Sequence, residues 1–121
     1  MGKNGLITYK GKEIYYMDFS KLNSTKKVTK VINVSKDYIR NQEPYSLLAL
    51  TNITNMHFNG EIRDLFTNFV NENKPYIKAS AVIGVSGLQG IVYNAVMKIS
   101  RRNVKLFKTA DDAKDWLIEQ F

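Results

Sequence analysis

Two short runs with strand-like patterns open the chain. Residues 5–10 alternate between the two faces of a strand, while residues 13–19 are apolar on both faces. A strand that is apolar on both faces is expected in the interior of a sheet. Between the two runs, Gly11 tolerates the positive φ that a tight turn requires. The pattern therefore predicts an N-terminal β-hairpin whose second strand is the more central one.

The next segment has the periodicity of a helix. Its inward positions recur at spacings of three and four residues, at Val28, Val31, Ile32, Ser35 and Ile39. Ser24 or Thr25 is expected to cap this helix, and Pro44 ends the segment because the residue before a proline avoids the helical region. The β-branched side chains of residues 28–34 leave a strand as the alternative.

The middle of the chain predicts a buried strand and a second helix. Residues 45–50 form a continuous apolar run of buried-strand type, and residues 51–58 follow as a polar loop. Asn59 can cap a helix that begins at Gly60 and stops before Pro75. The inward stripe of this helix is Ile62, Leu65, Phe66, Phe69 and Val70.

The C-terminal half alternates strands with helices. The expected elements are a strand over residues 77–85, a helix over residues 88–99, a strand over residues 104–107 and a last helix that Thr109 caps. The whole order is β-β-α-β-α-β-α-β-α, which implies crossover connections and a mostly parallel sheet. We predict an α/β fold: a single-layer mixed sheet of four to five strands, with an N-terminal hairpin and about four helices. Residues 1–121 are expected to form a single domain.

Composition narrows the class of protein. With 44% hydrophobic residues, the 121-residue chain can bury a real core. The absence of cysteine excludes disulfides, thiolate metal sites and a cysteine nucleophile. No signal-peptide pattern and no apolar run of bilayer length is visible. We therefore expect a cytoplasmic protein.

The positive charge is concentrated in the first third of the chain. The net charge is +7, and residues 1–42 carry nine Lys and Arg against three acids. Such a segment can attract nucleic acid, an anionic membrane or an acidic protein. The alternative is a solvated face that keeps the protein soluble, and the scattered lysines favour that interpretation.

Four segments together resemble the STAS-like superfamily, which contains the anti-sigma-factor antagonists. They are residues 11–18 (GKEIYYMD), 48–53 (LALTNI), 78–88 (KASAVIGVSGL) and 107–117 (FKTADDAKDWL). Their order and spacing carry the resemblance, which extends over nearly the whole chain. It implies a four- to five-stranded sheet with helices mainly on one face, and a non-enzymatic role in binding a protein, a nucleotide or a lipid.

The resemblance departs from the family at one functional position. Antagonists that are phosphorylated carry a serine or threonine where the helix after the third major strand begins. Here residues 58–62 read FNGEI, with no hydroxyl, and Thr51 and Thr54 lie earlier in the loop. We therefore carry no phosphorylation site over to this chain.

A polar loop at the carboxyl end of the third strand is the candidate binding site. Ligands of open α/β sheets gather at that edge, and we expect the loop to share one rim with residues 84–88. Free N–H groups where a helix begins can hold an anion. The candidate binding residues are Thr51, Asn52, Thr54, Asn55, His57, Asn59, Ser86 and Gly87. The alternative is an ordinary turn, because neither the P-loop nor the dinucleotide fingerprint is present.

No catalytic constellation is visible in the sequence. His57 is the only histidine, and no paired acid or base lies near it along the chain. We expect no enzyme activity, no metal and no cofactor. The preferred hypothesis is a regulatory module that binds a protein partner, or a small anion or nucleotide, at the predicted rim. The alternative is an electrostatic binder of nucleic acid or an anionic membrane, and the oligomeric state is left open, a homodimer included.

Overall fold

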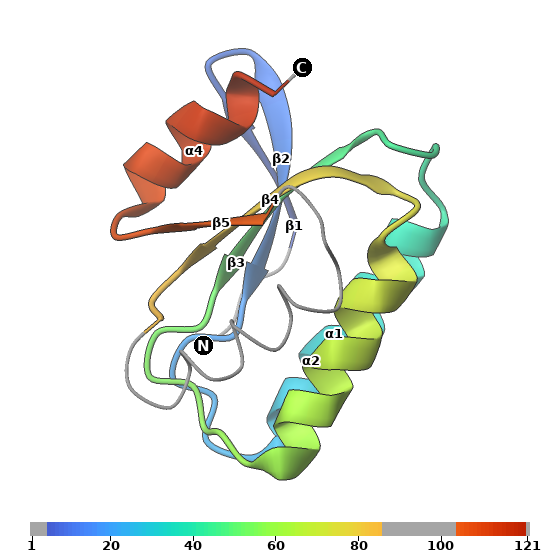
Figure 1. Cartoon of the computed structure of the whole chain (residues 1–121), viewed down its shortest axis with the longest axis vertical. Helices are drawn as coiled ribbons and strands as arrows, with labels where there is room; N and C mark the ends of the chain where they lie inside the picture. Colours follow the sequence, from blue (N-terminus) through green and yellow to red (C-terminus); the bar gives the residue numbers. More distant parts are fainter. Residues whose placement is uncertain (1–4, 86–103, 121) are drawn as a thin grey trace.

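The computed structural model describes residues 5–85 and 104–120, and it has strands and helices in the predicted alternation (Figure 1). The elements are β1 (Gly5–Tyr9), β2 (Lys12–Asp18), α1 (Thr25–Arg40), β3 (Leu47–Asn52), α2 (Gly60–Asn73), β4 (Ile77–Ile83), β5 (Val104–Phe107) and α4 (Ala110–Ile118). The described residues thus contain three helices, where about four were expected. The helix predicted over residues 88–99 lies outside them.

The five strands form one sheet in the order β1-β2-β3-β4-β5. β1 pairs antiparallel with β2, and the other neighbours are parallel. The mixed, mostly parallel sheet is therefore confirmed, and so is the inner position of β2. At the hairpin, Lys10 (φ 49°) and Gly11 (φ 82°) both adopt the positive φ of a two-residue type I′ turn.

Two hydrophobic cores lie on opposite faces of the sheet. On one face α1 and α2 pack against β2 and β3, with Phe19, Ile32 and Phe69 fully or almost fully buried. On the other face α4 inserts Ala113 and Leu117 against β3 and β4. Figure 1 shows α4 across the sheet from the other two helices. The expectation of helices mainly on one face holds for α1 and α2, whereas α4 covers the second face.

The first helix forms where the apolar periodicity places it. Ser24 caps α1, and its side chain accepts a hydrogen bond from the backbone N–H of Lys27. Val28, Ile32, Ser35 and Ile39 are all buried on one side of the helix. The alternative of a strand over residues 28–34 is therefore wrong: α1 runs through the segment, and its buried residues recur every three or four positions, which is the spacing of one helix face.

The third strand lies two residues further along the chain than predicted. Tyr45, expected in a buried strand, is 61% exposed and has φ 59°, since the chain turns after Pro44 before it joins the sheet. At the other end Thr51 and Asn52 belong to β3 rather than to a loop. Their register with Met17 and Asp18 of β2 extends the parallel ladder through them.

A polar contact ties the hairpin turn to α4. The Tyr9 hydroxyl donates to the Asp115 carboxylate at 2.7 Å, and Lys10 Nζ lies 3.1 Å from the same oxygen. The hydrogen bond from Tyr9, followed by the contact with Lys10, lowers the pKa of Asp115 below its usual value. The same carboxylate raises the pKa of Tyr9 and of Lys10. This contact braces the end of the molecule opposite to the predicted rim.

Candidate functional site

Two loops lie side by side at the carboxyl ends of β2 and β3. Residues 19–24 connect β2 to α1, and residues 53–59 connect β3 to α2. Backbone hydrogen bonds join them: Lys21 N–H donates to the Thr54 carbonyl, and His57 N–H donates to the Leu22 carbonyl, both at 2.8 Å. We call this pair of loops the carboxyl rim. The rim is a fixed surface because each loop supplies backbone partners to the other.

Asn52 and Thr54 are structural parts of the rim. The Asn52 side-chain oxygen accepts from the Thr54 N–H at 3.0 Å and from the Thr54 hydroxyl at 2.6 Å. The Asn52 amide nitrogen lies 3.1 Å from the Tyr16 hydroxyl on β2. These bonds shape the turn that follows β3, as asparagine does in turns of this kind. Asn52 and Thr54, predicted as binding residues, are thus already engaged within the protein.

Gly84 fixes the distance between β4 and the rim. Its φ is +86°, and a Cβ built on it would stand 2.5 Å from the Thr54 nitrogen and 2.7 Å from the Thr54 Cα. Only glycine allows the backbone to approach this closely. The strand end and the loop are therefore in contact, as expected for two loops that share one edge. The predicted binding residues Ser86 and Gly87 lie outside the described residues.

The remaining predicted residues of the loop differ in role. Asn55 is exposed and adopts φ 55°, which marks it as a turn residue. His57 is also exposed, and its Nε2 lies 3.4 Å from the Asn59 amide nitrogen. Asn59 caps α2, because its side-chain oxygen accepts from the Ile62 N–H at 2.9 Å. Of the predicted loop residues, Asn55 and His57 are the two exposed ones.

A contact between Asn59 and Thr25 brings the starts of two helices together. The Asn59 amide nitrogen donates to the Thr25 hydroxyl at 3.1 Å. Thr25 is the first residue of α1, and Asn59 is the N-cap of α2. Both helices therefore begin at the carboxyl rim, and the positive ends of their dipoles lie next to each other.

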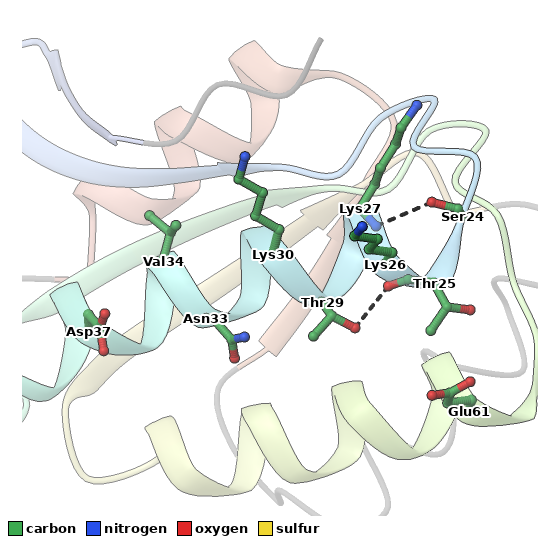
Figure 2. Close-up of a pocket in the computed structure, with 10 residues that line it drawn as sticks. All are labelled: Ser24, Thr25, Lys26, Lys27, Thr29, Lys30, Asn33, Val34, Asp37 and Glu61. Atoms are coloured by element: carbon green, nitrogen blue, oxygen red, sulfur yellow. Dashed lines mark hydrogen bonds between the residues drawn. The ribbon is translucent and has the colours of Figure 1, made fainter.

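The exposed surface of α1 continues the rim as an open depression (Figure 2). Lys27, Lys30 and Val34 project from one side of the helix, while Thr29 and Asn33 lie on the side of α2. The lining residues are Ser24, Thr25, Lys26, Lys27, Thr29, Lys30, Asn33, Val34, Asp37 and Glu61. The depression therefore joins the basic first third of the chain to the start of α2.

Three lysines of this surface lack an ionic partner in the part of the chain that the structure describes. Lys26, Lys27 and Lys30 are exposed, and none of the ion pairs found within residues 5–85 and 104–120 involves them. We call these three residues the lysine cluster. By contrast, Lys36 further along α1 pairs with Glu72 at 3.0 Å. The cluster thus keeps its charge available to a partner.

The charges in the first turn of α1 run against the usual helix pattern. α2 has Glu61 in its first turn, and α4 has Asp111 and Asp112, as the helix dipole favours. α1 has no acid in its first turn, where Lys26 and Lys27 stand instead. The rim therefore gathers positive charge from side chains and from the helix terminus at one place.

The sequence contained the signal for this surface but not its location. The excess of lysine in residues 1–42 predicts either a solvated face or an electrostatic binder of nucleic acid or an anionic membrane, and the polar loop is a separate candidate site. Only the fold shows that Thr25 and Asn59, 34 positions apart, are hydrogen-bonded. The lysine cluster is absent from the predicted binding residues for this reason.

Two kinds of site are absent from the described residues. Among residues 5–85 and 104–120, no three His, Asp or Glu side chains come together as a metal ion would require. Within the same ranges, no helix has the length and apolar content to cross a membrane.

A solved structure shares the fold of this chain. An uncharacterised protein of the DUF3478 family from Shewanella loihica PV-4, described as having a SpoIIAA-like fold, superposes with a TM-score of 0.75. The identity is 15%, over 96% of this chain and 93% of that one. No protein-family model matches the sequence, and no curated protein is significantly similar to it. The predicted fold resemblance is thus confirmed: the chain has a SpoIIAA-like fold.

Proposed function

We propose that the protein is a non-enzymatic interaction module that binds an acidic segment of a protein partner at the carboxyl rim and the lysine cluster. One observation carries the proposal. The hydrogen bond from Asn59 to Thr25 places the starts of α1 and α2 together, beside Lys26, Lys27 and Lys30. An anionic group at this place meets the side-chain cations and the positive end of α1, which has no acid in its first turn, whereas Glu61 already stands at the start of α2.

The shape of the surface supports a protein partner over a small molecule. Small-molecule sites are concave and mostly enclosed, with few polar groups. The depression on α1 is open to solvent, and its cations are spread along the helix surface from Lys26 to Lys30 (Figure 2). An extended acidic segment can contact several of these lysines at once, whereas a single small anion cannot.

The lysines in the first turn of α1 make the helix less stable than acids would, and this cost also supports a binding role. Ser24 is the N-cap of α1, and Lys27 stands three residues later. Glutamate at that position would complete a capping box with Ser24 and would favour the helix dipole. Positions where a sequence breaks such a local rule are expected at functional sites. Binding of an anion at the start of α1 accounts for the two lysines there.

The chemistry of the rim supports binding rather than catalysis. Turn and cap hydrogen bonds already engage the polar groups of Asn52, Thr54 and Asn59. His57 is exposed, and its Nε2 lies 3.4 Å from the Asn59 amide nitrogen rather than beside an acid that would orient the ring. The rim is thus a rigid, charged surface without an acid–base pair among its described residues.

The test is a comparison of two triple charge reversals. A fluorescent acidic peptide is titrated with the protein, and anisotropy gives the dissociation constant. Replacing Lys26, Lys27 and Lys30 with glutamate should weaken binding at least about tenfold, a loss of about 1.4 kcal/mol. The control replaces Lys74, Lys105 and Lys108 with glutamate, which changes the net charge equally but lies outside the rim. The control should retain most of the affinity.

Equal losses in the two triple variants would contradict the proposal, since they would show that net charge alone draws the peptide. Inorganic phosphate and a DNA oligonucleotide are titrated in parallel. Phosphate should bind far more weakly than the peptide. Binding of the oligonucleotide in preference to the peptide, with a steep salt dependence, would instead favour a nucleic-acid binder.

A further inference from the structure

The outer edge of β1 has backbone groups that no other strand of the described sheet pairs. β1 is the first strand in the sheet order, so β2 is its neighbour on one side. The two-residue turn makes Tyr9 and Lys12 the closing hydrogen-bonded pair of the hairpin. Hydrogen-bonded pairs alternate along an antiparallel ladder, so Ile7 also bonds to β2. Leu6 and Thr8 therefore direct their N–H and C=O groups outward.

This edge lacks the devices that usually prevent strand pairing. Edge strands are protected by charges, by proline, by bulges or by being very short. β1 reads GLITY, without a charge or a proline, and its register with β2 runs without a shift. The opposite edge differs, because β5 has four residues and Lys105 stands among them. The β5 edge is thus shorter and carries a charge, whereas the β1 edge is longer and uncharged.

The side chains along β1 are also partly uncovered. Leu6 is 46% exposed, although it is a large apolar residue, and Thr8 is exposed as well. Ile7 and Tyr9 pack toward the core beneath α4, so Leu6 and Thr8 point to the face that carries α1 and α2. A strand added at this edge would cover Leu6 and continue both faces of the sheet.

We propose that β1 pairs with β1 of a second copy, antiparallel and about a two-fold axis. With Ile7 opposite Ile7 of the second copy, Leu6 faces Thr8 and Thr8 faces Leu6. Every outward N–H then meets an outward C=O, so the strand is complementary to itself. The occupant is a second copy because the segment has no charge to repel its own copy or to select a charged partner.

The proposed dimer has a salt dependence that separates it from binding at the rim. Each chain carries a net charge of +7, so two copies repel each other at low ionic strength. Salt screens this repulsion and should strengthen the dimer. Binding of an acidic segment to the lysine cluster should weaken under the same change. Failure of one proposal therefore leaves the other testable.

The first test uses matched lysine substitutions on the two edges of the sheet. Leu6→Lys adds a charge to the β1 edge, and Leu106→Lys adds one to β5, where the leucine is 42% exposed. In sedimentation equilibrium at about 1 mM and raised salt, the wild type should exceed its monomer mass of 13.9 kDa. Leu6→Lys should raise the dimer dissociation constant at least about tenfold, because the two-fold axis introduces the charge twice. Leu106→Lys should leave it unchanged.

The second test uses the absence of cysteine from the chain. Opposed residues of a non-hydrogen-bonded antiparallel pair have Cα atoms about 4.5 Å apart, which lies within the span of a disulfide. Ile7→Cys should therefore form a disulfide-linked dimer under mild oxidation, faster than Leu106→Cys. This assay does not use the Leu6→Lys variant. Misfolding of that variant therefore leaves the result of the cross-linking assay valid.

Three outcomes would overturn the inference. They are a wild type that stays at the monomer mass at every concentration and salt, a Leu106→Lys variant that weakens the dimer as much as Leu6→Lys does, and equal cross-linking rates in the two cysteine variants. Any of them would show that the β1 edge does not pair with itself.

Discussion

Replacing Gly84 with alanine tests whether close approach to Thr54 holds the rim in place. The φ of Gly84 is +86°, a region that costs a residue with a Cβ about 1–2 kcal/mol. The added Cβ would also stand 2.5 Å from the Thr54 nitrogen and 2.7 Å from its Cα. Backbone atoms cannot rotate away, so one segment must shift, and such overpacking costs about 1–3 kcal/mol. We expect Gly84→Ala to lower the free energy of unfolding by about 2–4 kcal/mol, once the roughly 0.4–1 kcal/mol gained through the unfolded state is subtracted.

Gly11 provides the matched control for this substitution. Its φ is +82°, almost the same as that of Gly84, but a Cβ there would meet no atom within 4 Å. Gly11→Ala therefore carries the backbone cost alone, about 1 kcal/mol after the loss of unfolded-state entropy is counted. The difference between the two variants isolates the contact with Thr54.

Urea denaturation gives the two free energies, and the single tryptophan, Trp116, reports the transition. Its ring packs against Phe107 with centroids 5.5 Å apart, at a distance along the chain from both substitutions. The reasoning is refuted if Gly84→Ala and Gly11→Ala lose equal stability. Such a result would mean that the rim loop yields easily and that Gly84 does not position it.

Three further predictions concern the rim and the opposite end of the molecule. Lys27→Glu should raise the free energy of unfolding by about 0.5–1 kcal/mol, because it completes a capping box with Ser24, while it weakens binding of an acidic peptide; denaturation and anisotropy on one sample check both signs. Asn59→Ala should cost about 1–2 kcal/mol in urea denaturation through loss of the α2 cap, whereas Asn59→Asp keeps the cap oxygen and should cost less. The contact of Tyr9 with Asp115 should lose its contribution to stability on both sides of neutrality. The contribution of Asp115 is lost as the pH falls through its lowered pKa, and that of Tyr9 is lost as the pH rises through its raised pKa. Thermal unfolding of wild type and Asp115→Asn should therefore differ near neutral pH and converge in acid; a constant difference would contradict this.

Most of the fold could be predicted because local patterns dominate it. Three features depend on residues that lie close together in the sequence: the turn at Gly11, the buried stripe from Val28 to Ile39 and the cap at Asn59. The error at Tyr45 has a non-local cause. The backbone N–H of Tyr45 donates to the Pro75 carbonyl, and β3 joins the sheet only after this contact. An apolar run does not contain that information.

The candidate site could be predicted only in part for a related reason. The carboxyl edge of β3 was expected from topology, and its polar loop does lie there. The cap at Asn59 could be read from the sequence, but the engagement of the Asn52 side chain with Thr54 and Tyr16 depends on geometry that a polar composition does not reveal. The lysine cluster joins the rim through a hydrogen bond between two helix starts. Residues that meet through tertiary packing leave no periodic trace in a single sequence.

The most direct test of the central claim is a map of where an acidic peptide binds. Amide chemical shifts of the isotope-labelled protein are followed during titration with the peptide at low and at raised salt. The account predicts shifts in residues 21–30 and 53–61 that saturate together and shrink with salt, with the β1–β2 hairpin unaffected. Shifts confined to the hairpin or to α4, or shifts that do not change with salt, would contradict it.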